Sequence, residues 1–218
     1  RERLFVRSTQ IPLFTPQTEW VMPDELKDLR GAKEIAIDLE TNDPDLKELG
    51  SGNVVGKGHI AGIAVAVEGW SGYFPIGHES NGNMDKKLVF SWLQDMFNQE
   101  ATTFIFHNAM YDICWLRSAG LIIKGKIVDT MIAASLIDEN RLSYQLNTLS
   151  RHYIGMGKDE NILNAAAKEY GIDAKKDLWR LPAMFVGQYE VAWEDMAAAA
   201  VVTMLPPFLI ALFFQLCD

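Results

Sequence analysis

Two carboxylic acids, two positions apart, end an apolar run near the start of the chain. The run is Glu34-Ile-Ala-Ile-Asp-Leu-Glu-Thr-Asn42, and its two acids of interest are Asp38 and Glu40. Residues i and i+2 of a β-strand point to the same face, so both side chains would project together from the end of one strand. Two carboxylates this close are hard to keep ionised without a cation between them, and their oxygens suit Mg²⁺ or Mn²⁺. The alternative is a strand that runs out into solvent, where neither acid has a function.

A second cluster lies where a β-rich run meets a helical one. The segment Phe104-Ile-Phe-His-Asn-Ala-Met-Tyr-Asp-Ile-Cys-Trp-Leu116 ends a predicted strand at His107 and continues as a helix. Asn108 and Asp112 are four residues apart, which places them on one face of that helix. Asn is also a favoured N-cap, so Asn108 has a purely structural alternative. Asp112 lies in an otherwise apolar helix, where a carboxylate needs a partner or a metal.

Composition limits the classes of function. The 218 residues are 49% hydrophobic and 22% charged, as is typical of one or two soluble globular domains. The net charge of −9 argues against a general nucleic-acid binder, but less against a nuclease whose site is itself acidic. Two isolated cysteines exclude a zinc site and a disulfide framework, and they favour a reducing compartment. No secretory signal is visible, and the start at Arg1 favours a fragment of a longer protein.

The elements that must position these acids follow from periodicity. Strands are predicted at residues 34–42, 59–67, 72–76, 103–106 and 122–128, and helices at 24–29, 85–98, 109–120, 129–136, 144–153, 159–170 and from 182 onward. Residues 42–58 are predicted to form a long loop next to Asp38 and Glu40, and long loops beside a site are often functional or mobile. Asp129 reads as an N-cap. Strands first, then alternation, then helices predict an α/β fold with a mixed β-sheet flanked by helices.

Three regions are expected along the chain. Residues 1–30 form an irregular lead-in, residues 31–205 form the main domain, and residues 206–218 form an apolar C-terminal helix. The apolar run Phe208–Cys217 is too short to span a bilayer, so we expect it to lead to a missing partner domain and expect no membrane association.

The ordered motifs resemble those of the DEDD superfamily of metal-dependent 3′–5′ exonucleases. The first motif of that family, Asp-x-Glu, corresponds to Asp38-Leu-Glu40-Thr41, and the second, Asn-x-x-x-Asp, corresponds to Asn108-Ala-Met-Tyr-Asp112. The segment FHNAMYD is most similar to the proofreading domains of bacterial and phage family A DNA polymerases. The resemblance runs from about residue 33 to 190. It implies a ribonuclease H-like fold.

The third family motif, Tyr-x-x-x-Asp or His-x-x-x-x-Asp, is irregular here. None of the four histidines lies near the C-terminal helix, and Tyr189 is followed four residues later by Trp193, with the nearest aspartate at Asp195. A six-residue step lands about 120° away on a regular helix, so Tyr189 and Asp195 would not share a face. A helix that begins after Tyr189, or a local bulge, would bring them together. Glu194 is an alternative ligand, and a solvated acidic stripe is the alternative to any function.

The resemblance also implies a chemistry. Two Mg²⁺ or Mn²⁺ ions would be held by carboxylates, with Tyr189 positioning the attacking water and with Thr41 and Asn108 contacting the 3′-terminal nucleotide. Asp38 would bridge both ions and Glu40 would hold one and help to orient the water. Asp112 and Asp195 would complete the shells, and the product would be a nucleoside monophosphate.

The implied partners are the 3′ end of single-stranded DNA and a polymerase domain in the same or another chain, in the cytoplasm of a bacterial or phage-infected cell. Two alternatives stay open at this point. One is an RNase D-like exoribonuclease, which shares the three motifs. The other is a catalytically weakened domain that binds nucleic acid or a partner protein, motivated by the position of Asp195 and by the apolar tail.

Overall fold

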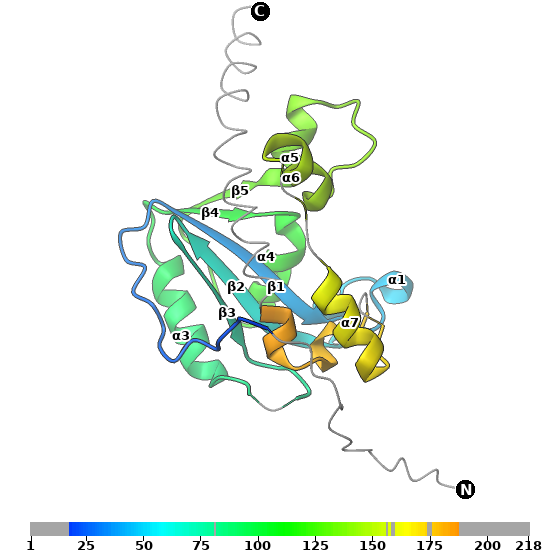
Figure 1. The fold of residues 1–218 in the computed structure, drawn as a ribbon. Helices are drawn as coiled ribbons and strands as arrows, with labels where there is room; N and C mark the ends of the chain where they lie inside the picture. The colour runs from blue at the N-terminus through cyan, green and yellow to red at the C-terminus, as the bar shows by residue number, and fades with distance from the viewer. Residues whose placement is uncertain (1–17, 81, 156, 158–159, 174–175, 188–218) are drawn as a thin grey trace, which may run out of the picture.

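The computed structural model describes residues 18–80, 82–155, 157, 160–173 and 176–187, which form a mixed five-stranded sheet flanked by helices (Figure 1). The strands are β1 (Glu34–Asn42), β2 (His59–Val67), β3 (Trp70–Pro75), β4 (Thr103–Phe106) and β5 (Lys126–Asp129). The α-helices are α1 (Leu46–Leu49), α2 (Gly52–Val55), α3 (Lys86–Phe97), α4 (Ala109–Ser118), α5 (Thr130–Ile137), α6 (Leu146–Tyr153) and α7 (Asn161–Tyr170), and a 3₁₀ turn, η1, spans Leu178–Arg180. Residues 183–187 are also helical.

Strand β1 lies at the centre of the sheet, whose order is β3-β2-β1-β4-β5. It pairs antiparallel with β2 through residues 36–42, with a register shift between Glu40 and Thr41, but parallel with β4 only through residues 34–36. The chain leaves β4 at Phe106 and turns into α4, so α4 comes beside the second half of β1, where no strand occupies that side. Thr41 of β1 and Tyr111 of α4 are joined there by a hydrogen bond of 2.7 Å between their hydroxyls.

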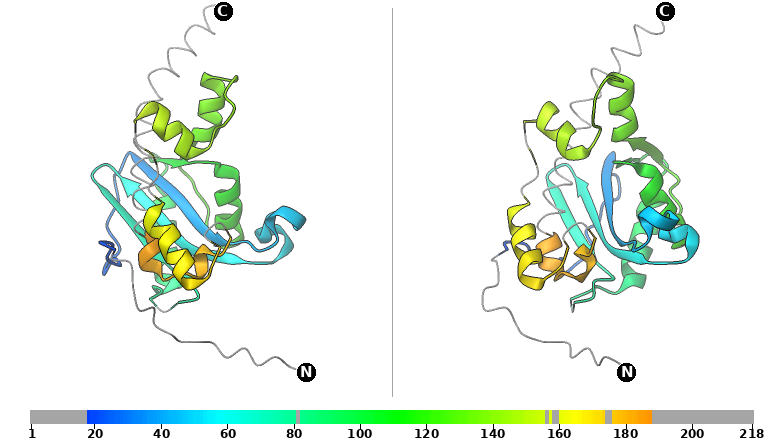
Figure 2. Two further views of the ribbon diagram at one scale, coloured as in Figure 1. Left: turned by 45° about the vertical axis from the view of Figure 1, so that its right-hand side comes forward. Right: turned by 90° about the vertical axis from the view of Figure 1, so that its right-hand side faces the viewer.

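The two faces of the sheet are covered by different helices. Alternate residues of β1, namely Ile35, Ile37 and Leu39, are buried in the main core with the apolar faces of α3 and α4. A second apolar cluster joins Ala64 of β2 and Tyr73 of β3 to α7 and to residues 181–186. The right-hand view of Figure 2 accordingly shows α7 and α4 on opposite sides of the sheet. The predicted α/β class with a helix-flanked mixed sheet is confirmed.

Aspartate side chains cap three of the helices. Asp85 accepts hydrogen bonds from the amides of Lys87 and Leu88 at the start of α3. Asp129 caps α5, as the sequence predicts, and it also accepts from the amides of Asn108 and Ala109 at the start of α4, at 3.1 and 2.8 Å. Because N-terminal amides of a helix have no partner within the helix, one carboxylate here satisfies the starts of two helices.

Two predicted elements are wrong in part. Residues 24–29 are not helical, because Asp28 instead accepts from the amide and guanidinium of Arg30, a local alternative to helix formation. The predicted strand 122–128 is reduced to β5, because its first half is held to α3: Ile122 hydrogen-bonds the side chain of Gln94, and the Lys124 amide donates to the Phe97 carbonyl.

The segment 42–58, expected as a loop, contains the two short helices α1 and α2. Its return to the sheet depends on Gly58, which has φ +79° and whose Cβ, if present, would lie 2.0 Å from the carbonyl oxygen of Asn42. Only glycine tolerates both the conformation and the close approach. In the described part of the chain, no helix has the length and apolarity needed to cross a bilayer.

Candidate active site

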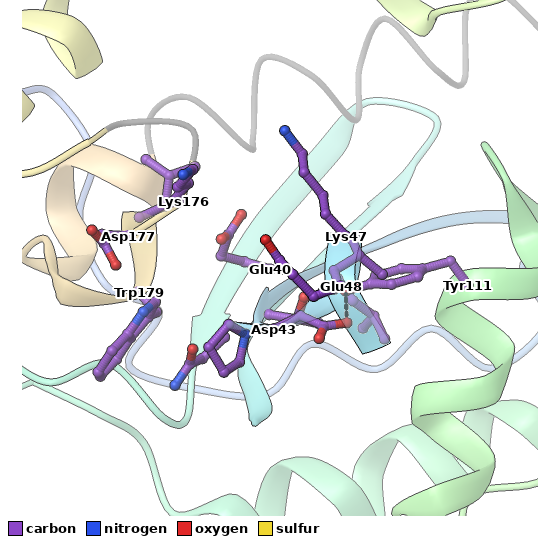
Figure 3. Close-up of a pocket in the computed structure, with 14 residues that line it drawn as sticks. Glu40, Asp43, Lys47, Glu48, Tyr111, Lys176, Asp177 and Trp179 are labelled. Carbon is purple, nitrogen blue, oxygen red and sulfur yellow. Dashed lines mark hydrogen bonds between the residues drawn. The ribbon is translucent and has the colours of Figure 1, made fainter. Parts of the chain in front are cut away.

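A pocket of about 510 Å³ opens at the carboxyl end of β1. Its floor is the end of β1 with Glu40 and Thr41, and one wall is formed by residues 42–44, residues 46–48 and Tyr111. The opposite wall comes from residues 176–179, which are far away in the sequence. Figure 3 shows Glu40 between the Lys176–Trp179 wall and the wall that carries Lys47 and Tyr111.

Asp38 and Glu40 lie on the face of β1 opposite the main core, as their spacing predicts. Their neighbours Ile37 and Leu39 are buried, whereas both acids are half-buried. Across the sheet, Asp38 is paired with Ala64 and Glu40 with Gly62. Gly62 is required there, because a Cβ would lie 1.9 Å from the hydroxyl of Tyr73. Gly62 thus makes room for the ring of Tyr73, which lies over the β2 residue that is paired with Glu40.

Asp112 lies in the first turn of α4 and is 3% exposed. The helix N-terminus carries partial positive charge, which favours a carboxylate at this position. Asp38, Glu40 and Asp112 each have an interaction partner in the structure, so none is an isolated charge. Among the residues that are described, no group of three or more His, Cys, Asp or Glu side chains forms a metal site by itself. The donor set of carboxylate oxygens nevertheless fits Mg²⁺ or Mn²⁺ in kind.

Asn108 occupies the N-cap position of α4 but does not cap with its side chain. Its backbone is left-handed, with φ 66° and ψ 51°, and it is the only non-glycine residue with positive φ in the described part of the chain. Asp129 supplies the capping hydrogen bonds in its place. The exposed Asn108 side chain is therefore not engaged in capping, although Asn108 does stand at the start of α4. Unusual backbone conformations of this kind concentrate at functional sites.

A hydroxyl–carboxylate chain fixes the wall beside α4. Tyr111 donates to a carboxylate oxygen of Asp43 at 2.9 Å, so its oxygen accepts from the hydroxyl of Thr41 at 2.7 Å. Burial raises the pKa of Tyr111 to about 12, and the adjacent Asp43 carboxylate adds to that rise. Asp43 also accepts from the amide of Gly52 at 3.1 Å, which ties segment 42–58 to α4. Thr41, predicted to contact substrate, is thus held in place by Tyr111.

The opposite wall is held by a buried histidine that the sequence did not single out. The carbonyl of Leu181 must accept from Nδ1 of His78 at 3.1 Å, so Nε2 accepts from the hydroxyl of Tyr73 at 2.6 Å. Burial lowers the pKa of His78 to about 4. Two further contacts reinforce this link between the β3–α3 connection and η1: the amide of Glu79 donates to the Trp179 carbonyl, and the Glu79 carboxylate pairs with Arg180.

Tyr189, Glu194 and Asp195 lie outside the described residues, and so does the apolar run 208–217. The residues that sequence reasoning missed are those of the second wall and Asp43. Lys176 and Trp179 carried no signal, because they reach the pocket only through contacts such as His78–Leu181, 103 residues apart. Asp43 did carry a sequence signal, because it directly follows the strand that contains Asp38 and Glu40.

Comparison with known proteins agrees with this geometry. Residues 14–175 match the family described as 3′–5′ exonuclease. A DNA-directed DNA polymerase of Pseudomonas phage M6 is 41% identical over 189 residues, which are 83% of this chain and 28% of that protein. The DNA polymerase DpoZ of Acinetobacter phage SH-Ab 15497 is 32% identical over 128 residues, which are 56% of this chain and 20% of that protein. The chain therefore spans less than a third of the length of these relatives.

Solved structures resemble the fold. Trypanosoma brucei RNase D in complex with GMP has a TM-score of 0.59 at 16% identity, with 80% of this chain and 51% of that chain covered. Escherichia coli RNase D has a TM-score of 0.56 at 14% identity, with 82% of this chain and 40% of that chain covered. These likenesses confirm the ribonuclease H-like fold. With the family match over residues 14–175 and the acidic motifs on β1 and α4, the chain belongs to the 3′–5′ exonuclease family, of the type found in family A DNA polymerases.

Proposed function

We propose that this chain hydrolyses single nucleotides from the 3′ end of DNA in a reaction that requires divalent cations. The observation that carries the proposal is the position of Asp38 and Glu40, side by side on one face at the end of β1, where Glu40 enters the pocket. Membership of the 3′–5′ exonuclease family supplies the direction of cleavage.

The charge of the pocket supports the need for cations. Its lining contains four carboxylates, from Glu40, Asp43, Glu48 and Asp177, against two ammonium groups, from Lys47 and Lys176. A phosphodiester entering this pocket meets a net negative lining, which repels it unless cations neutralise the acids.

The residues proposed to hold these ions are Asp38, Glu40 and Asp112, with Asp195 as a fourth ligand. Two divalent ions at such a site stabilise the attacking and leaving oxygens of an in-line phosphoryl displacement. Glu40, at the pocket floor, also helps to orient the attacking water, and Tyr189 is the proposed second contact of that water. Thr41 and Asn108 are proposed to contact the terminal nucleotide, Thr41 from its place beside Tyr111.

DNA is the proposed substrate because the relatives at 41% and 32% identity are DNA polymerases. The likeness to RNase D is one of fold and supports no choice of RNA. The chain spans 28% of the phage M6 polymerase, so we propose that it works beside a polymerase domain, in the same or another chain.

Digestion of matched 5′-labelled DNA and RNA oligonucleotides with Mg²⁺ or Mn²⁺ tests the proposal. We expect a ladder that shortens from the 3′ end of DNA, is abolished by EDTA, and is absent from the Asp38→Ala/Glu40→Ala variant. A ladder on RNA alone would favour the exoribonuclease. Folded protein that binds DNA without cutting it would favour a binding domain and contradict the proposed reaction.

A further inference from the structure

We infer that the pocket grips a single strand between its two walls, with Lys47 and Lys176 on phosphates and with the indole of Trp179 stacked on a base. The inference rests on the proposed function and adds residues that the sequence motifs do not contain. All three side chains line the pocket that contains Glu40, Lys47 on one wall and the other two on the opposite wall (Figure 3).

The two lysines differ from the cations around them. Lys57 and Arg180 are both neutralised, the first by Asp45 at 2.5 Å and the second by Glu79 at 3.1 Å. Among the described residues, neither Lys47 nor Lys176 forms an ion pair, although each is exposed. Two ammonium groups that have no carboxylate partner in the described part of the chain, on opposite walls of one pocket, are suited to phosphates that pass between them.

Trp179 is held before any ligand arrives. Its ring packs edge-on against His59, with the ring centroids 5.6 Å apart and the planes at 83°. His59 is itself fixed, since its Nε2 donates to the carbonyl of Gly77 at 2.8 Å. A perpendicular contact with one ring leaves at least one face of the indole uncovered by that ring, and Trp179 is half-buried in the pocket wall. A fixed aromatic face stacks an unpaired base at little entropic cost, whatever the identity of the base.

A single strand fits this arrangement better than a duplex does. Stacking on Trp179 requires a base that is free of its partner strand, and contact with both walls requires a backbone that enters between them. The strand would then pass over Glu40, which brings its terminal phosphodiester toward Asp38 and Glu40. Lys47, Lys176 and Trp179 would thus act as positioning residues that align the strand with the acidic site.

Anisotropy of a labelled single-stranded DNA oligonucleotide, titrated over a salt series, tests the inference. Binding is measured in the Asp38→Ala/Glu40→Ala background, so that no cleavage intervenes. Each phosphate contact on a single strand contributes about 0.7 to the slope of log affinity against log salt, so Lys47→Gln/Lys176→Gln should lower that slope by about 1.4. The matched control is Lys33→Gln/Lys124→Gln, two exposed lysines outside the pocket lining, which should leave the slope unchanged.

Trp179 is tested with a pair of substitutions in the same background. Trp179→Leu should weaken binding about tenfold, and Trp179→Phe should restore most of it, because a phenyl ring still stacks. A purely structural role would show as a lowered unfolding temperature with no rescue by phenylalanine.

An unchanged salt slope in the lysine variant would overturn the phosphate contacts, and equal affinity of the leucine and phenylalanine variants would overturn the stacking. Neither readout depends on hydrolysis. A wild-type chain that cuts no DNA would therefore defeat the proposed function, while the binding slopes would still decide the inference.

Discussion

Three carboxylates of the candidate site are held in different ways. Asp38 and Glu40 are half-buried on a strand, where the backbone period alone keeps them on one face. Asp112 is almost fully buried in the first turn of α4. A buried acid is positioned more tightly than an exposed one, so we expect Asp112 to be the least replaceable of the three.

The isosteric change Asp112→Asn tests that expectation. Removing a partner that only supports a metal ligand typically lowers metal affinity or activity by about 10- to 100-fold, and losing a ligand should do at least as much. We expect 3′-end cleavage to fall at least about 100-fold while the far-ultraviolet circular dichroism spectrum stays unchanged. The matched control is Asp95→Asn, an exposed acid on α3. Full activity of Asp112→Asn would remove this residue from the site.

Tyr111 has a supporting role that can be separated from the chemistry. Tyr111→Phe removes the donor to Asp43 and the acceptor for Thr41, and it leaves a partly buried carboxylate with one partner fewer. We expect the free energy of unfolding to fall by about 1–3 kcal/mol in urea titrations, with faster proteolysis within residues 42–58. Thr41→Val removes only the hydrogen bond between the two hydroxyls, which is weaker than the one to the carboxylate, so it should lower the free energy of unfolding by less. Equal costs for the two variants would argue against the assigned direction of donation.

At the scale of elements, Asp129 joins two helices that the site needs. It accepts from amides at the starts of both α4 and α5, whereas Asp85 caps α3 alone. Removal of a capping side chain costs about 1 kcal/mol, so Asp129→Ala should destabilise the protein about twice as much as Asp85→Ala. Urea unfolding of both variants measures the ratio. A ratio near one would mean that the hydrogen bonds to α4 contribute little.

Elements with a clear period could be predicted from the sequence, and elements shaped by distant contacts could not. Strands β1, β2 and β4 match their predicted bounds, because apolar alternation and a buried run are local signals. The predicted strand is wrong for the residues before β5, because they hydrogen-bond the Gln94 side chain and not a strand of the sheet. Residues 24–29 fail, because a short segment with an Asp28–Arg30 interaction gains more locally than it would from one turn of helix.

The site divides in the same way. The motif acids Asp38, Glu40 and Asp112 could be proposed from spacing, since a strand and a helix start are both local structures. The wall formed by residues 176–179 could not be proposed from spacing. Trp179 and Lys176 are brought to the pocket by long-range contacts such as the hydrogen bond between His78 and the Leu181 carbonyl. The predicted roles of Tyr189 and Asp195, and the boundaries 1–30, 31–205 and 206–218, stay predictions.

At the scale of the whole molecule, His78 couples stability to pH. Its pKa is lowered to about 4 by burial, against about 6.5 in an unfolded chain. Above pH 6.5 the group is neutral in both states. As the pH falls from 6.5 toward 4, the unfolded state gains a proton that the folded state does not, so stability is lost across that window.

The loss from His78 should approach about 3 kcal/mol at pH 4, since each unit of pKa difference corresponds to about 1.4 kcal/mol. Urea unfolding of wild type and His78→Gln between pH 7 and pH 4.5 measures it. We expect a smaller pH slope in the variant. Some slope should remain, because burial also lowers the pKa of His107. Identical slopes in both proteins would show that His78 titrates normally in the folded state.

Calorimetric titration with Mn²⁺ of wild-type protein and the Asp38→Ala variant asks most directly whether these carboxylates form a metal-dependent hydrolytic site. A two-ion site predicts two binding events in the wild type, and both should weaken in the variant, because Asp38 is the proposed bridging ligand. No Mn²⁺ binding by folded wild-type protein, or binding unaffected by Asp38→Ala, would contradict that assignment.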